Sequence, residues 1–427
     1  MDGFVLVTTA WLLAGPRIEL LSIASSSIRL EDLLLFALLV LAAVHGWKRV
    51  KAVVGLRMLV ATGAVVTVGI LSAVIAVAAG RIDALAGLLY VARPIEYWVV
   101  LPAVLLCLKR SEGRSRRVVV TLAVVTCLQV TVGALQVLGV PIGFSKFTYE
   151  RAAGLTAGPY ELGAMCAMLV CFWLYRRSYA LAAIALVGII LSQSRISLAA
   201  VALGIAIILL SAWGTISRSL ARLWRRRAVF VSTLAGIFVL TVLLAAWLGR
   251  PVIERLTDTS LVNAWVDAQR FSHAAPILTT SDAYSHVAFD RIDTVLTGAS
   301  IEDVSNVVRF FRWQLLLAAM AATPLAWVFG LGPSFAGPSV DGTILRILVE
   351  FGLVGLIAWI AWFYQSVRGA GVWLVAVLAT LVVGSTTIDL MFALRPMVLF
   401  WFLAAFARIE RPLRDAALSP RSTSDQG

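Results

Sequence analysis

The stretch Asp341-Gly-Thr-Ile-Leu-Arg-Ile-Leu-Val-Glu-Phe-Gly-Leu-Val-Gly355 begins an apolar run that continues to about residue 364. A run of this length crosses the hydrocarbon core of a bilayer as one helix. Its first residue is a carboxylate, and a charged group at the mouth of a membrane helix is costly unless it is solvated or paired. We therefore interpret 341–364 as a membrane span that begins with a candidate functional group.

The composition of the whole chain agrees with this interpretation. Its 427 residues are 61% hydrophobic and 14% charged, with a mean hydropathy of +0.94. This excludes a soluble domain and predicts an all-α polytopic membrane protein with about twelve helices. The first apolar run, 3–15, spans only if it continues to about residue 25. The other predicted spans are 30–46, 53–79, 85–107, 118–140, 158–175, 179–194, 196–213, 228–248, 341–364, 371–387 and 391–407.

Basic residues follow every second span, which places them all on one side of the membrane. Cytoplasmic loops collect Lys and Arg, so this side is expected to be cytoplasmic. The net charge of +13 then reports orientation and attraction to anionic lipid, and it does not indicate nucleic-acid binding. The chain divides into helices in 1–248, a large periplasmic loop at 249–340 with an interfacial helix near 307–322, helices in 341–407, and a disordered cytoplasmic tail at 408–427.

Neither the cysteines nor the histidines form a recognisable site. All four cysteines lie in predicted spans, so no disulfide framework is expected. The three histidines are scattered, and no phosphate-binding loop or dinucleotide fingerprint is present. We therefore expect no metal and no cofactor.

Arginines recur at the predicted outer ends of the helices, where the charge rule predicts few of them. A single arginine there is explained by snorkelling toward the headgroups. Several together could hold a pyrophosphate, because guanidinium pairs bidentately with phosphate. A lipid diphosphate is the ligand that would need them. The set comprises Arg151, Arg195, Arg309, Arg312, Arg346 and Arg395.

At these residues the sequence resembles the O-antigen polymerase and O-antigen ligase superfamily. Four segments carry the resemblance, in the order of the family. They are Arg151–Leu162 with its Gly-Pro-Tyr-Glu-Leu end, Ser194-Arg195, Arg309–Trp313 followed by Pro324-Leu325 and Gly330-Leu-Gly332, and Asp341 through Glu350, Gly352 and Gly355. The resemblance covers roughly residues 25–407.

The resemblance implies a GT-C-like glycosyltransferase of the bacterial inner membrane, with about twelve helices and a large external loop. Its substrate would be a glycan linked to undecaprenyl diphosphate, transferred to an acceptor hydroxyl at the periplasmic face without a metal. Besides membrane lipid, the implied partners are the lipid-linked donor and acceptor, a chain-length regulator and a flippase.

One position separates the two branches of the family. Ligases carry a His where this chain has Asp341, whereas the following spacing to Gly352 and Gly355 is kept. This favours a polymerase, which uses a second lipid-linked repeat unit as acceptor. His273 and His286 in the loop keep the ligase, which uses lipid A-core, as an alternative. A protein O-oligosaccharyltransferase and a lipid-linked oligosaccharide transporter are further alternatives.

The predicted chemistry requires a base for the acceptor hydroxyl and cations for the leaving diphosphate. Asp341 is the leading base and Glu161 the second choice. Asp341 could instead be a helix N-cap, and Glu161 a first-turn carboxylate or a partner of Arg151. Tyr160 and Trp313 are expected to contact sugar, although aromatics at this depth also anchor helices. The diphosphate-binding residues are expected to be Arg151, Arg195, Arg309, Arg291 and Arg395.

Overall fold

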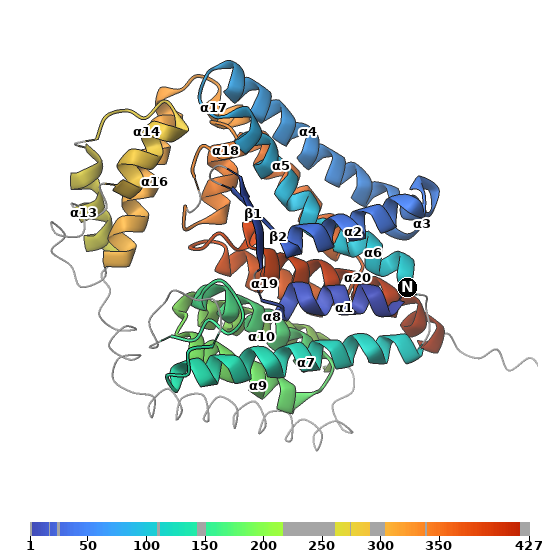
Figure 1. Cartoon of the computed structure of the whole chain (residues 1–427). Coiled ribbons are helices and arrows are strands. Elements are labelled where there is room, and N and C mark those ends of the chain that lie inside the picture. The colour runs from blue at the N-terminus through green and yellow to red at the C-terminus, as the bar shows by residue number, and fades with distance from the viewer. Residues whose placement is uncertain are drawn as a thin grey trace, which may run out of the picture.

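The computed structural model describes residues 2–16, 18–23, 26–108, 112–142, 151–216, 261–273, 275–290, 304–337 and 340–418. These residues are helical apart from turns and one two-stranded hairpin (Figure 1). The helices are α1 (Asp2–Ala14), α2 (Leu30–Val44), α3 (Trp47–Val54), α4 (Leu56–Ala78), α5 (Ala84–Trp98), α6 (Val100–Cys107), α7 (Glu112–Val137), α8 (Pro159–Tyr175), α9 (Tyr179–Ser192), α10 (Arg195–Ile216), α13 (Leu261–His273), α14 (Ser281–Ser285), the π-helix η1 (His286–Asp290), α16 (Val304–Ala322), α17 (Ala326–Phe329), α18 (Thr343–Val367), α19 (Val372–Gly384), the 3-10 helix η2 (Leu390–Phe392) and α20 (Leu394–Leu418).

Four helical segments in the described part of the chain are long and apolar enough to cross a membrane. They are α4, the α5–α6 pair, most of α7, and α18. A fifth is added if α2 and α3, which meet at an angle of 103°, count as one span. Helices α1, α8, α9, α10 and α19 are apolar but shorter. These are the features of an α-helical membrane protein, whereas the count of about twelve spans stays a prediction.

The sequence left open whether the first helix continues to about residue 25, and the structure answers this question. Helix α1 ends at Ala14, and the chain then forms strand β1 (Glu19–Ile23), which pairs antiparallel with β2 (Ser26–Arg29). Pro16 explains the early end, because its ring fixes φ, removes a backbone donor and disfavours helix in the residue before it. Of the two alternatives, the structure therefore contains the short first helix.

The C-terminal boundary also needs correction, because α20 continues to Leu418. The tail at 408–427 is thus not disordered from its start. Glu410 forms an ion pair with Arg176 (2.5 Å), which ties this part of α20 to the end of α8. The predicted span 228–248 lies outside the described residues, as do residues 419–427.

The core forms around α8, in which all residues from Leu162 to Leu174 are buried. Helix α8 packs against α9, α10 and α19, and the C-terminal half of α20 lies beside it. Helices α13, α14 and α16 form a separate group at one end of the molecule (Figure 1). Helix α16 covers the predicted helix near 307–322, and its position at the membrane interface stays a prediction.

Helices α4 and α18 run antiparallel and pack closely. Ser72 of α4 donates to the Glu350 carbonyl (2.7 Å), and Trp362 of α18 donates to the Thr62 hydroxyl (2.8 Å). Following the predicted sidedness, we call the end near Thr343 the outer end of this pair. The end near Val367 is the inner end.

Helix α18 is broken at Gly352, whose φ of 68° and ψ of −171° are not helical. The break leaves carbonyl groups of α18 without helical partners, and N–H groups of the loop before α18 donate to them. Leu331 N–H donates to the Val349 carbonyl (2.7 Å) and Gly332 N–H to the Glu350 carbonyl (3.2 Å). A Cβ at Gly352 would lie 2.2 Å from the Val328 carbonyl oxygen, so only glycine fits here. The break thus fastens the loop before α18 to its middle.

Candidate functional site

Asp341 lies at the outer end, immediately before α18. Its backbone is in the left-handed region, with a φ of 57°. Its Oδ2 atom is 3.2 Å from Nη1 of Arg312, and its side chain is 33% exposed. The N-cap residue of α18 is Gly342, which makes no side-chain cap hydrogen bond. The N-cap alternative for Asp341 is therefore not what the structure contains.

The surroundings of Asp341 are built by α16 packing against the start of α18. Trp313 donates its indole N–H to the Val340 carbonyl (3.0 Å), and Arg312 Nε donates to the Ala288 carbonyl (3.2 Å). A Cβ at Gly342 would lie 3.0 Å from the Trp313 ring, so this glycine lets the aromatic ring approach the backbone. Trp313 consequently lies beside the turn that carries Asp341, and its contact with a sugar stays a prediction.

A buried ion network lies beneath this turn. Arg346 is 1% exposed and pairs with Glu350 (3.3 Å) and Asp389 (3.1 Å). It also donates to the Gly337 carbonyl. Its guanidinium carbon lies 5.3 Å from the Tyr90 ring centroid and 5.0 Å from that of Phe392, within the range of cation–π attraction. Two carboxylates and two rings therefore hold this cation in place.

Asp389 connects the buried network to the turn that carries Asp341. Its Oδ2 atom accepts from the Val340 N–H (2.8 Å) and its Oδ1 atom from the Gly342 N–H (3.4 Å). The backbone N–H groups of the residues before and after Asp341 are thus bound by one carboxylate. Asp389 therefore positions the candidate base.

The sequence interpretation assigned no role to Asp389 or Glu350. A signal was available for Glu350, because Arg346 and Glu350 are spaced i,i+4 and share a helix face. Asp389 is the acidic residue between the last two predicted spans. Its partner could not be inferred, because the turn that it meets is far away in the sequence.

A second group of predicted residues surrounds the start of α8. The Arg151 guanidinium lies 4.6 Å from the Tyr160 ring centroid and donates to the Tyr160 hydroxyl (3.3 Å). It also donates to the carbonyls of Ser192 (3.2 Å) and Gln193 (3.4 Å). Three acceptors therefore orient Arg151. The guanidinium of Arg151 lies over the Tyr160 ring.

Glu161 and Arg195 lie in the first turns of their helices. Glu161 Oε2 accepts from the Ala157 N–H (3.2 Å), which matches the first-turn alternative for this residue. Arg195 begins α10 and is half-buried. Both are thus placed at helix starts, as predicted.

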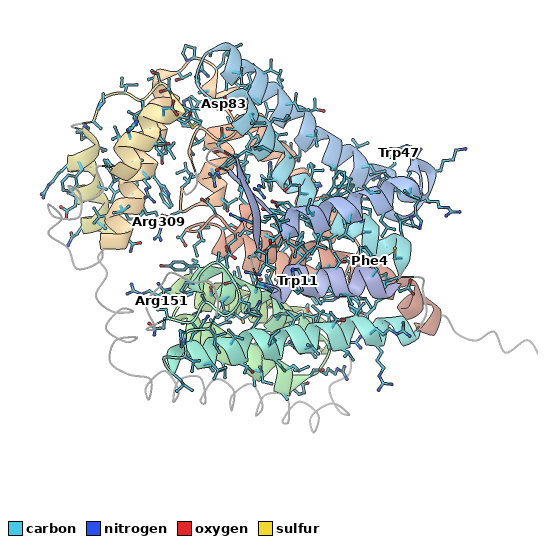
Figure 2. All side chains as sticks on the ribbon, viewed as in Figure 1. Phe4, Trp11, Trp47, Asp83, Arg151 and Arg309 are labelled. Carbon is cyan, nitrogen blue, oxygen red and sulfur yellow. The ribbon has the colours of Figure 1, made fainter. Side chains whose placement is uncertain are left out.

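The remaining predicted arginines have different settings. Arg309 of α16 donates to the Asn306 side chain (2.6 Å), and Figure 2 shows it at the same side of the molecule as Arg151. Arg395 is buried and donates to the Gly15 carbonyl (2.5 Å). Arg291 lies outside the described residues. Arg312, by contrast, lies beside Asp341. The sequence interpretation had not given this arginine a role beside the candidate base.

Tyr284 of α14 is completely buried and packs near Phe335. Burial raises the pKa of the Tyr284 hydroxyl above its ordinary value, because the phenolate would lose its solvation. Tyr284 therefore belongs to the buried core between α13, α14 and α16.

In comparisons with known proteins, no family model matches the chain and no curated sequence matches it.

Proposed function

We propose that the protein is an inner-membrane glycosyltransferase that polymerises a glycan carried on undecaprenyl diphosphate. The observation that carries the proposal is the setting of Asp341. This carboxylate caps no helix, it is one-third exposed, and Arg312 and Asp389 fix its side chain and its backbone. An acidic group held in this way beside Trp313 is suited to act on a bound sugar hydroxyl.

In the proposed reaction, the acceptor hydroxyl oxygen attacks the anomeric carbon of the donor glycan. The bond from this carbon to the diphosphate oxygen breaks, and undecaprenyl diphosphate leaves with the electron pair. The hydroxyl proton passes to the Asp341 carboxylate. Arg312 holds the carboxylate by its Nη1 atom (3.2 Å), so that one orientation is favoured before the acceptor binds.

The leaving diphosphate needs positive charge as it departs, and positioned guanidinium groups supply it. We assign this role to Arg151, Arg195 and Arg309. Arg151 is already oriented by Tyr160 and two carbonyl groups. A pre-oriented guanidinium stabilises developing charge with little further ordering.

The test is to incubate the purified protein with radiolabelled lipid-linked repeat units, with and without lipid A-core, and to separate the products by size. A ladder of long lipid-linked chains is the expected result. Transfer to lipid A-core alone would replace the polymerase with the ligase alternative. Recovery of only the starting lipid-linked units, from protein that binds them, would contradict a transferase.

A further inference from the structure

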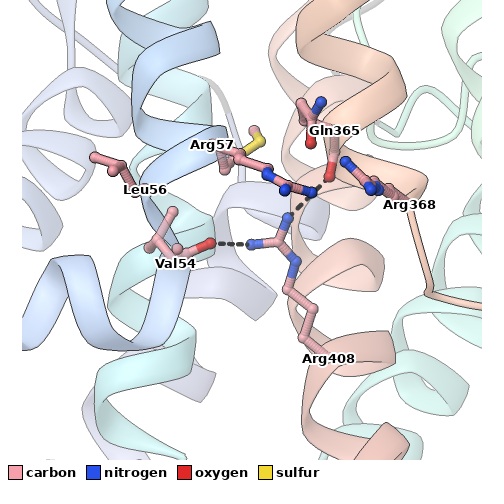
Figure 3. Close-up of a pocket in the computed structure, with 8 residues that line it drawn as sticks. Val54, Leu56, Arg57, Gln365, Arg368 and Arg408 are labelled. Carbon is pink, nitrogen blue, oxygen red and sulfur yellow. Dashed lines mark hydrogen bonds between the residues drawn. The ribbon is translucent and has the colours of Figure 1, made fainter.

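A cavity of about 420 Å³ lies at the inner end of the α4–α18 pair, where α3 turns into α4. Three of its lining residues are arginines from three helices: Arg57 of α4, Arg368 at the end of α18, and Arg408 of α20 (Figure 3). Among the described residues, its lining contains no Asp or Glu. The described lining therefore carries three positive charges and no negative one.

Arg408 is the fixed member of this set. Its Nη1 atom donates to the Val54 carbonyl (3.0 Å) and its Nη2 atom to the Gln365 carbonyl (3.2 Å). Arg57 extends toward Gln365 from α4, and Arg368 lies on the other side of Gln365 (Figure 3). Arg57 and Arg368 are exposed, whereas Arg408 is half-buried. One arginine thus bridges the helices, and the other two are free to move onto a ligand.

The charge on this cavity is not balanced within the described part of the chain. None of the three arginines forms an ion pair with a described carboxylate. Like charges that converge on one site repel each other, and a bound anion would offset that repulsion. The first turn of α4 also faces this corner, and a helix N-terminus favours negative charge. Guanidinium groups beside a helix N-terminus suit a phosphate.

The neighbouring helix α3 indicates where such a phosphate comes from. It is bent by 103° from α2, and its Val50 and Val54 are buried. Trp47 is 63% exposed beside three exposed basic residues. The basic residues are Lys48, Arg49 and Lys51. A short helix with this pattern lies along a membrane surface, with tryptophan at the headgroup level. The cavity at its end is then within reach of lipid headgroups.

We propose that the phosphate group of an anionic membrane lipid binds in this cavity, between Arg57, Arg368 and Arg408. Basic pockets between membrane helices at the cytoplasmic side take anionic headgroups for this electrostatic reason. The lipid joins the α3–α4 corner to the end of α18 and to α20 at Arg408. Its site lies at the opposite end of the α4–α18 pair from Asp341, so it is separate from the proposed transfer reaction.

The experiment measures lipid binding to the purified full-length protein in detergent by native mass spectrometry. Phosphatidylglycerol is the probe, and phosphatidylethanolamine, a zwitterionic lipid with no net charge, is the comparison. The test variant carries Arg57→Gln and Arg368→Gln, which leaves the carbonyl bonds of Arg408 intact. We expect its Kd for phosphatidylglycerol to rise about tenfold, because two charge-assisted contacts are lost.

The matched control carries Lys48→Gln and Arg49→Gln, which removes two charges from the same corner but outside the cavity. Its Kd is expected to rise less than about twofold. Equal increases of the Kd in both variants would mean that surface charge in general, and not this cavity, attracts the lipid, which would overturn the proposal. An unchanged Kd in the test variant would overturn it as well. If equimolar inorganic phosphate displaced the lipid, the cavity would be a site for free phosphate. This result would overturn the proposal that a lipid supplies the phosphate group.

Folding is checked by tryptophan fluorescence during heating in the same detergent. If the double variant does not fold, Arg57→Gln alone decides the question, because this residue is exposed. The single variant is expected to weaken phosphatidylglycerol binding about threefold. Wild-type affinity in the folded single variant would overturn the proposal.

Discussion

The two ends of the α4–α18 pair hold arginines in opposite settings. At the outer end, Arg346 pairs with Glu350 and Asp389, and Arg312 pairs with Asp341. At the inner end, the described lining of the cavity contains three arginines and no carboxylate. Buried charge that the protein neutralises itself holds a structure in place, whereas exposed charge left unneutralised is available to a ligand. The same residue type therefore has a structural role at one end and a binding role at the other.

The largest expected effect comes from removing Arg346, which neutralises two carboxylates at the outer end of the α4–α18 pair. Arg346→Met leaves Glu350 buried without its cation, so we expect a loss of roughly 3–5 kcal/mol in the free energy of unfolding. Thermal unfolding in detergent, followed by size-exclusion fluorescence, measures this.

The control is the double variant Arg346→Met with Glu350→Met, which removes both charges of the pair. It should recover much of the stability, because no unpaired carboxylate remains at position 350. If both variants were equally unstable, packing rather than charge balance would explain the role of Arg346.

The second prediction tests whether Asp341, unlike the other charged residues at the outer end, affects turnover and not stability. Asp341→Asn should lower turnover at least about 100-fold, because an amide cannot accept the proton. Stability should hardly change, because the side chain is partly exposed and caps no helix. Polymer formation and the unfolding temperature are measured on the same preparation.

Asp83→Asn is the matched control, because Asp83 is a true N-cap that accepts from the Ala86 N–H (2.9 Å). Asn caps a helix about as well as Asp, so this variant should keep full activity. A fully active Asp341→Asn protein would exclude Asp341 as the base and make Glu161 the next candidate.

The third prediction concerns the break that lies between the two ends. Gly352→Ala should destabilise the protein by about 1–3 kcal/mol, because the backbone conformation at Gly352 is one that essentially only glycine adopts. The added Cβ would also meet the Val328 carbonyl. Gly63→Ala on α4 is the control, since nothing lies within 4 Å of its Cβ. Equal stability of the two variants would show that the break is not required for the fold.

The smallest effect is expected from removal of divalent cations. If arginines neutralise the leaving diphosphate, excess EDTA should change the rate of polymer formation less than about twofold. The measurement uses the purified protein and labelled substrate in matched buffers. Loss of activity that one specific cation restores would contradict the assignment of this role to arginines.

The sequence predicted the positions of the long helices well, because the length of an apolar run determines a membrane helix. The expected span 53–79 corresponds to α4, and the run from 341 corresponds to α18. The break at Gly352 was not predicted. A glycine is tolerated within a helix, and the break becomes apparent only from the loop that bonds to it.

The candidate site was predictable only where neighbours in the sequence decide the contacts. Arg151 and Tyr160 are near each other in the sequence and meet in the structure. The pairing of Arg312 with Asp341, and of Asp389 with the turn before α18, depends on how separate helices pack. Composition and periodicity do not contain that information.

The spacing of Arg346 and Glu350 also has a consequence for how the protein is made. An unpaired arginine in a membrane helix raises the free energy of insertion, by up to roughly 2.5–3.5 kcal/mol at the bilayer centre. Because its first partner lies one turn later on the same helix, α18 can enter the membrane as a neutral segment during synthesis. Asp389 emerges only later, with the last two helices, and it joins a cation already in the bilayer. The order of residues along the chain therefore gives Arg346 a partner on its own helix before Asp389 is made.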